Sequence, residues 1–107
     1  MFSLKTMYEA LADVGGDVDT VQMYLENGTP MGGFYTALFE NNLARAVITA
    51  DSHNKHKLIA ITQWLLWYAP TACYGSPEKV HNWMYKGGYK QWNTLIKSLV
   101  DSKEVSA

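Results

Sequence analysis

The sequence has only one cysteine, and it has no long apolar run. With Cys73 alone, an intramolecular disulfide and a multi-cysteine zinc site are excluded, which suits a reducing compartment. No segment approaches the roughly 20 apolar residues that cross a bilayer, and residues 1–5 lack the basic stretch and apolar run of a leader. We therefore expect a cytoplasmic protein that does not enter a membrane.

The sequence also lacks any run that alternates apolar and polar residues as an exposed-face strand does, whereas apolar residues recur at helical spacing. A chain of 107 residues forms one domain that buries about two-thirds of its unfolded surface. We predict an all-α fold over residues 1–107: a compact bundle of six to seven short helices around a central apolar helix at about 53–69. The tail 102–107 is expected to fray.

Capping residues and glycines divide the first half of the chain. Gly15-Gly16 ends the first expected helix, and Asp17 is a good N-cap for the second, which stops at Gly28. Thr29-Pro30 repeats the start signal, because threonine caps well and proline fits the first helical position. The three expected helices are about 3–14, 18–27 and 30–41.

The second half is divided in the same way. After a break at Asn41-Asn42, Asp51 or Ser52 is expected to cap a longer helix that runs to about Tyr68, where Pro70 stops it. Ser76-Pro77 is the sharpest start signal, for a helix ending at Gly87-Gly88. The helix between the break and Asp51 is expected to turn four side chains inward: Leu43, Ala46, Val47 and Ala50. A last amphipathic helix is expected to bury Trp92, Leu95, Ile96, Leu99 and Val100.

Charge and aromatic rings are unevenly distributed. Residues 1–42 hold six acids against Lys5, a net charge of −5, while residues 43–97 hold seven Lys or Arg against two acids, a net of +5. All four tryptophans lie in the basic half, which suits planar anionic ligands. Since the total charge is only −1, generic DNA binding through bulk charge is not expected.

The basic, ring-rich half supplies the candidate binding residues. Nucleotide bases stack on Trp and Tyr with about 1–3 kcal/mol each, lysines neutralise phosphates, and the helix start at Ser76 offers free amides to an anion. A plain helix cap competes with that last role. Trp64, Trp83 and Trp92 fall on apolar stripes and are expected in the core. The candidate ligand-binding residues are therefore Trp67, Tyr74, Ser76, Lys79, Tyr85, Lys86, Tyr89 and Lys90.

No residue set indicates a reaction or a cofactor. His53 and His56 have the spacing of metal ligands, but Lys55 and Lys57 beside them repel a cation. Cys73 has only His81 near it in sequence as a possible base, so we expect a packed thiol rather than a nucleophile. No catalytic residue, metal ligand or cofactor is assigned.

Several motifs resemble those of small, uncharacterised proteins encoded by bacteriophages and prophages. The resemblance spans about residues 25–86 and includes Gly28-Thr29-Pro30, Asn41-Asn42-Leu43 and Ala50-Asp51; its most specific part is the element Gly-Ser-Pro-Glu-Lys-Val at 75–80. It implies an accessory phage product in the cytoplasm of an infected bacterial host, and it carries no catalytic residue.

The sequence predicts a non-enzymatic, counter-defence binder. The leading hypothesis is that it sequesters a small anionic host molecule, such as a nucleotide-type immune signal. The alternative is an inhibitor that binds and blocks a host defence or replication protein, because exposed rings also form contacts in protein interfaces. A small phosphodiesterase and a structural part of the virion are further hypotheses. A homo-oligomer is consistent with each binder.

Overall fold

Seven α-helices make up most of residues 3–88, the part of the chain that the computed structural model describes, and no strand occurs in this part. The predicted all-α fold is confirmed. In chain order the helices are α1 (Leu4–Asp13), α2 (Val18–Asn27), α3 (Gly33–Phe39), α4 (Leu43–Thr49), α5 (Ser52–Lys55), α6 (Leu58–Tyr68) and α7 (Pro77–Lys86). A 3-10 turn, η1 (Thr71–Cys73), connects α6 to α7. The expected last helix and the expected fraying of 102–107 lie outside the described residues.

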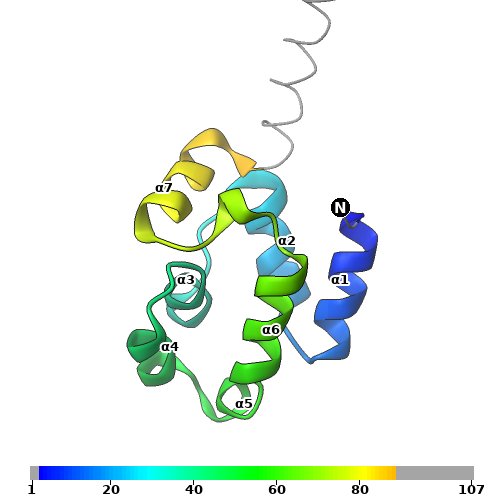
Figure 1. The fold of residues 1–107 in the computed structure, drawn as a ribbon, viewed down its shortest axis with the longest axis vertical. Coiled ribbons are helices and arrows are strands. Elements are labelled where there is room, and N and C mark those ends of the chain that lie inside the picture. The colour runs from blue at the N-terminus through cyan, green and yellow to red at the C-terminus, as the bar shows by residue number, and fades with distance from the viewer. Residues whose placement is uncertain (1–2, 89–107) are drawn as a thin grey trace, which may run out of the picture.

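The helices form one compact unit (Figure 1). Helix α1 packs against α2 and against one side of α6, and α3 pairs with α4 as a hairpin. Helix α7 packs on η1 and on α3, so it closes the end of the unit where α2 also ends. Within residues 3–88 no helix has the length and apolar character needed to cross a membrane.

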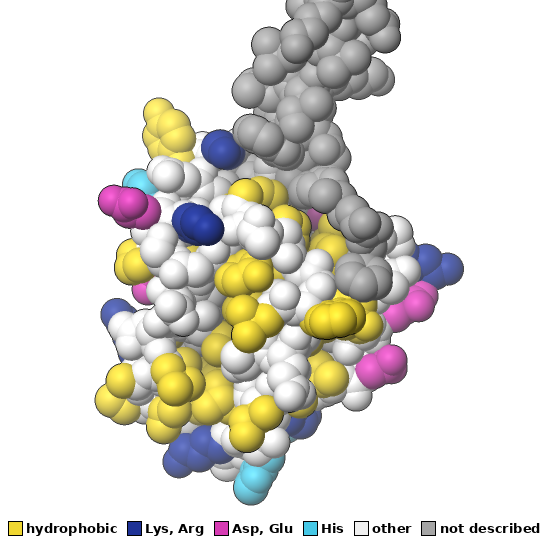
Figure 2. All heavy atoms as spheres, viewed as in Figure 1, with side chains coloured by type: hydrophobic (Ala, Val, Ile, Leu, Met, Phe, Trp, Pro, Cys, Tyr) yellow, Lys and Arg dark blue, Asp and Glu magenta, His cyan; other side chains and the backbone are white. Residues whose placement is uncertain are grey.

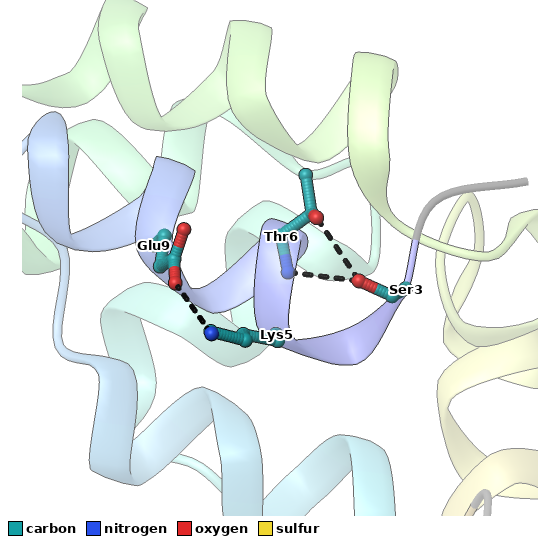
Figure 3. Close-up of polar contacts among 4 residues, drawn as sticks. All are labelled: Ser3, Lys5, Thr6 and Glu9. Carbon is teal, nitrogen blue, oxygen red and sulfur yellow. Dashed lines mark hydrogen bonds and ion pairs between the residues drawn. The ribbon is translucent and has the colours of Figure 1, made fainter.

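Side chains at the helix starts satisfy free backbone amides. The Asp17 carboxylate accepts from the Thr20 amide at 3.2 Å, and the Ser76 hydroxyl accepts from the Lys79 amide at 3.2 Å. Both predicted caps are confirmed, and Asp51 caps a helix as well. The Ser3 hydroxyl caps α1 through the Thr6 amide at 3.1 Å, next to an exposed Lys5–Glu9 pair 3.9 Å apart that adds little stability (Figure 3).

The predicted start of the third helix at Thr29-Pro30 is wrong. Helix α2 ends with Gly28 in the left-handed conformation, and the Thr29 amide then donates back to the Met23 carbonyl at 3.3 Å. Thr29 therefore completes the end of α2 instead of starting the next helix. Helix α3 begins four residues later, at Gly33.

The predicted single helix at about 53–69 is divided in two. Helix α5 ends at Lys55, and α6 starts at Leu58. Lys57 lies at this break, and its ammonium donates to the Gly15 carbonyl at 3.3 Å, in the turn between α1 and α2. The break therefore places a cation on a neighbouring turn, a tertiary contact that helical periodicity does not indicate.

The core is centred on α2 and α3 rather than on α6. Tyr24 and Phe39 are fully buried and meet edge to face with ring centroids 5.3 Å apart. Three buried donors fix distant segments: the Tyr24 hydroxyl donates to the Cys73 carbonyl at 2.7 Å, the Trp64 indole to Met7 at 2.8 Å, and the Trp83 indole to Tyr24 at 3.0 Å. Trp64 and Trp83 are core residues as predicted.

Candidate interaction surface

Helix α6 is apolar on two opposite sides, but it buries only one of them. Ile61, Trp64 and Leu65 are buried at spacings of three and four residues, as expected for a helix packed on one face. Ile59 and Leu66 on the other side are 75% and 64% exposed. The expectation that the other helices surround this segment is therefore wrong for its outer side.

Helix α4 exposes large apolar side chains next to that outer side. Ala46 and Ala50 face inward as predicted, but Leu43 and Val47 do not: they are 62% and 46% exposed. The reason is packing distance. The small Ala46 and Ala50 side chains permit α4 to lie close to α3, with which it forms a hairpin.

A groove connects the two exposed surfaces at Leu43 and Leu66. It encloses about 300 Å³ between the start of α4, α6 and the segment Tyr74-Gly75, and both Leu43 and Leu66 line it. Figure 2 shows hydrophobic side chains gathered over α4 and across α6 on this side of the molecule. We call this surface the α4–α6 face; its residues, 46–81% exposed, are Leu43, Val47, Ile48, Ile59 and Leu66.

A second groove lies on the other side of Leu66, between α1 and α6. It encloses about 610 Å³, and the described residues that line it are mainly apolar, with Asp13 the one charged residue among them. Trp67, 72% exposed, lies at this groove. We call it the α1–α6 groove; its lining residues are Ala10, Asp13, Val14, Ala60, Gln63, Trp64, Leu66, Trp67 and Tyr68.

A third, polar cavity of about 350 Å³ lies near the start of α2. Its groups are already engaged within the fold: Tyr35 accepts from the Asp17 amide at 2.7 Å, and Asp17 and Asp51 cap α2 and α5. His53 contacts the Lys57 ammonium at 2.6 Å. Among residues 3–88, no three His, Cys, Asp or Glu side chains gather in a way that would hold a metal ion.

The candidate residues from the sequence fall in separate places. Trp67 lines the α1–α6 groove, whereas Tyr74 lines the groove that Leu43 and Leu66 border. Ser76 caps α7, and the Lys79 ammonium donates to the Thr71 carbonyl at 3.4 Å. Tyr85 is 88% exposed on α7, and Lys86 follows it in the last turn of that helix. Tyr89 and Lys90 lie outside the described residues.

These positions do not form one concave site for an anion. Of the described residues that line these three cavities, none is a lysine or an arginine. The surface that the structure assembles instead uses Leu43, Val47, Ile48 and Ile59, none of which was a candidate. One signal in the sequence pointed to them: residues 43–50 carry a small-residue stripe, Ala46 and Ala50, beside the larger apolar side chains.

No family model, curated protein or solved structure matches this chain.

Proposed function

We propose that this chain acts by binding another protein through the α4–α6 face. The observation that carries the proposal is the contiguity of exposed Leu43 and Leu66 across one apolar groove. Scattered single apolar residues are ordinary on a protein surface, whereas large apolar side chains gathered on adjacent helices around a groove are typical of interaction sites. Such a groove accommodates an apolar side chain of a partner.

The charge near this face indicates the character of the partner. Arg45 on α4 and Lys55 on α5 are exposed, while the nearby Asp51 carboxylate accepts from the Asn54 amide at 2.7 Å. Basic side chains around an apolar centre favour a partner with acidic groups around an apolar contact, because complementary charge speeds encounter and fixes orientation.

In the context that the phage resemblance implies, the partner is a bacterial host protein whose action is blocked by occupancy of its own interface. The role assigned here is binding rather than catalysis. The Cys73 thiol is buried, and the Asp17 and Asp51 carboxylates serve as helix caps.

Affinity capture with matched variants tests the proposal. The tagged full chain is expressed in infected bacteria, and captured proteins are quantified by mass spectrometry. We expect one host protein to be captured by the wild type and by Tyr85→Glu, whose side chain lies on α7 outside the face, and to be lost with Leu43→Glu and Leu66→Glu. All three positions are exposed, so these changes are expected to leave the fold intact. Equal capture by all variants would contradict the proposal.

Binding of a small anion, such as a nucleotide, is the second candidate function. Tyr85 supports it, because an 88% exposed ring beside Lys86 on α7 offers stacking and charge together. A nucleotide panel tests it: a ligand should raise the melting temperature, and Tyr85→Ala or Lys79→Ala should reduce that shift. If no nucleotide shifts the melting temperature, this candidate is excluded.

A further inference from the structure

The α1–α6 groove offers an accessible indole ring beside open space. Ala10 of α1 and Ala60 of α6 both line it, and their short side chains leave room between the two helices. Trp64 is buried and its indole donates to the Met7 carbonyl at 2.8 Å, whereas Trp67 is 72% exposed. The volume of about 610 Å³ lies within the roughly 300–1,000 Å³ of small-molecule sites. A flat organic molecule therefore fits here against the ring of Trp67.

Two polar side chains at this groove are not used by the fold. Among the contacts of residues 3–88, neither the Asp13 carboxylate nor the Gln63 carboxamide has a hydrogen-bond or ion-pair partner. Other acids of the same part of the chain are engaged: Asp17 caps α2, Glu26 accepts from a tyrosine hydroxyl, and Glu9 pairs with a lysine. Asp13 is thus an acid that is left for a ligand.

Charge around the groove selects a cation. Asp13 is the one charged residue among the described lining, and Figure 2 shows acidic side chains on the side of the molecule where Figure 1 draws α1. Residues 1–42, which form this side, carry a net charge of −5. The face of an indole ring also attracts cations, and tryptophan does so more strongly than the other aromatic residues. Asp13 and Trp67 therefore favour the same sign of charge in a ligand.

We propose that the α1–α6 groove binds a small aromatic cation, with its flat ring on Trp67 and its positive charge toward Asp13. One such molecule satisfies both residues, whereas a single lysine or arginine side chain of a protein partner would fill only part of the volume. This site is additional to the proposed protein binding: it uses a different groove, with Leu66 as the residue that borders both.

A matched pair of probes tests the charge preference. N-methylacridinium and acridine have the same three-ring shape, but only the first is charged at about pH 8. We expect isothermal titration calorimetry on the full chain to show one N-methylacridinium bound per chain, several-fold more tightly than acridine. Asp13→Asn should weaken N-methylacridinium roughly two- to fivefold, as for an exposed ion pair, and leave acridine unchanged.

The control for this substitution is Asp19→Asn. Asp19 is exposed on α2 and does not line the groove, yet its loss changes the net charge by the same amount. N-methylacridinium should bind this variant as it binds the wild type. Trp67→Ala should weaken both probes, because both stack on the ring, and the exposure of Trp67 means that the fold should tolerate the change.

Methyl resonances locate the bound probe. N-methylacridinium should shift the NMR signals of the Ala10 and Ala60 methyl groups, which line the groove, and leave that of Ala46 on α4 unchanged. The proposal is overturned if N-methylacridinium does not bind, if the two probes bind equally, or if Asp13→Asn and Asp19→Asn have equal effects. Shifts at Ala46 without shifts at Ala10 and Ala60 would also overturn it. None of these results depends on capture of a host protein by the α4–α6 face.

Discussion

Cys73 shows how burial determines what a side chain can do. Its thiol is fully buried, and burial raises its pKa to about 12, from an ordinary value near 9. The neutral thiol is therefore the form present in the fold at physiological pH, and a thiolate nucleophile is not available. The Tyr24 hydroxyl that donates to the Cys73 carbonyl is also buried, and burial raises the pKa of that phenol too.

These groups predict that the fold loses stability at alkaline pH. Since the pKa of Cys73 is higher in the folded than in the unfolded chain, its contribution is fully present below about pH 9 and is lost as pH rises toward about 12. The pKa values of the partly buried Tyr8 and of the buried Tyr24 are also raised, and both act in the same direction. Urea unfolding at about pH 8 and about pH 10.5 should show lower stability at the higher pH, with a smaller difference in Cys73→Ala.

Alkylation independently measures how accessible the Cys73 thiol is. At about pH 8 the native thiol should resist iodoacetamide, while the chain in urea should react readily. Equal reaction rates in the native and unfolded states would show that Cys73 is accessible and would refute this account of its environment.

The start of α7 and the end of α2 show which helix signals act locally. The Ser76 hydroxyl accepts from the Lys79 amide, so Ser76→Ala should destabilise the protein by about 1 kcal/mol, which corresponds to roughly 4–8 °C in melting temperature. Thr29→Ala is the matched control, because Thr29 is exposed and α3 has Gly32, not Thr29, at its N-cap. A loss of stability in Thr29→Ala equal to that in Ser76→Ala would contradict this assignment of the caps.

Gly28 is needed for the contact between α2 and α7. Its φ is +74°, and a Cβ there would lie 2.8 Å from the Met84 carbonyl oxygen. Gly28→Ala should therefore cost more than about 1 kcal/mol, through backbone strain and this clash. At Gly32 an added Cβ meets no atom within 4 Å, so Gly32→Ala should be neutral or slightly stabilising in thermal unfolding. Equal effects of the two substitutions would be inconsistent with the packing of these helices.

The success of the sequence predictions depended on distance along the chain. The caps at Asp17 and Ser76 join groups three residues apart, so the sequence contains all the information they need. The burial of Ala46 in place of Leu43 depends on how α4 packs against α3, and the break at Lys57 places that side chain on Gly15, 42 residues away. Periodicity identifies apolar stripes, but neighbouring elements decide which stripe is buried.

The predictions for the candidate site also failed where they depended on contacts between distant parts of the chain. The exposure of Trp67 and Tyr85 agreed with the expectation of accessible rings, but the fold placed the two side chains on different helices. The face that it formed instead joins two helices through Leu43 and Leu66. Neither the stretch around Leu43 nor the stretch around Leu66 indicates, by its own sequence, that the two residues border one groove.

Across the whole molecule, α6 has an uncommon position, because its outer surface separates two apolar grooves. Leu66 lines both of them. We propose the α4–α6 face as the binding site of a protein partner. Two large apolar surfaces on a domain of this size are an aggregation liability unless both are covered in the working state.

Hydroxyl-radical footprinting of the chain, free and bound to its captured partner, tests the central claim most directly. Oxidation of Leu43, Ile48, Ile59 and Leu66 should fall strongly on binding, because the partner covers the α4–α6 face. Met23 on α2 and Tyr85 on α7, which are exposed outside that face, should be oxidised equally in both states. Protection of Tyr85 with unchanged oxidation of Leu43 and Leu66 would contradict the account and place the binding site on α7.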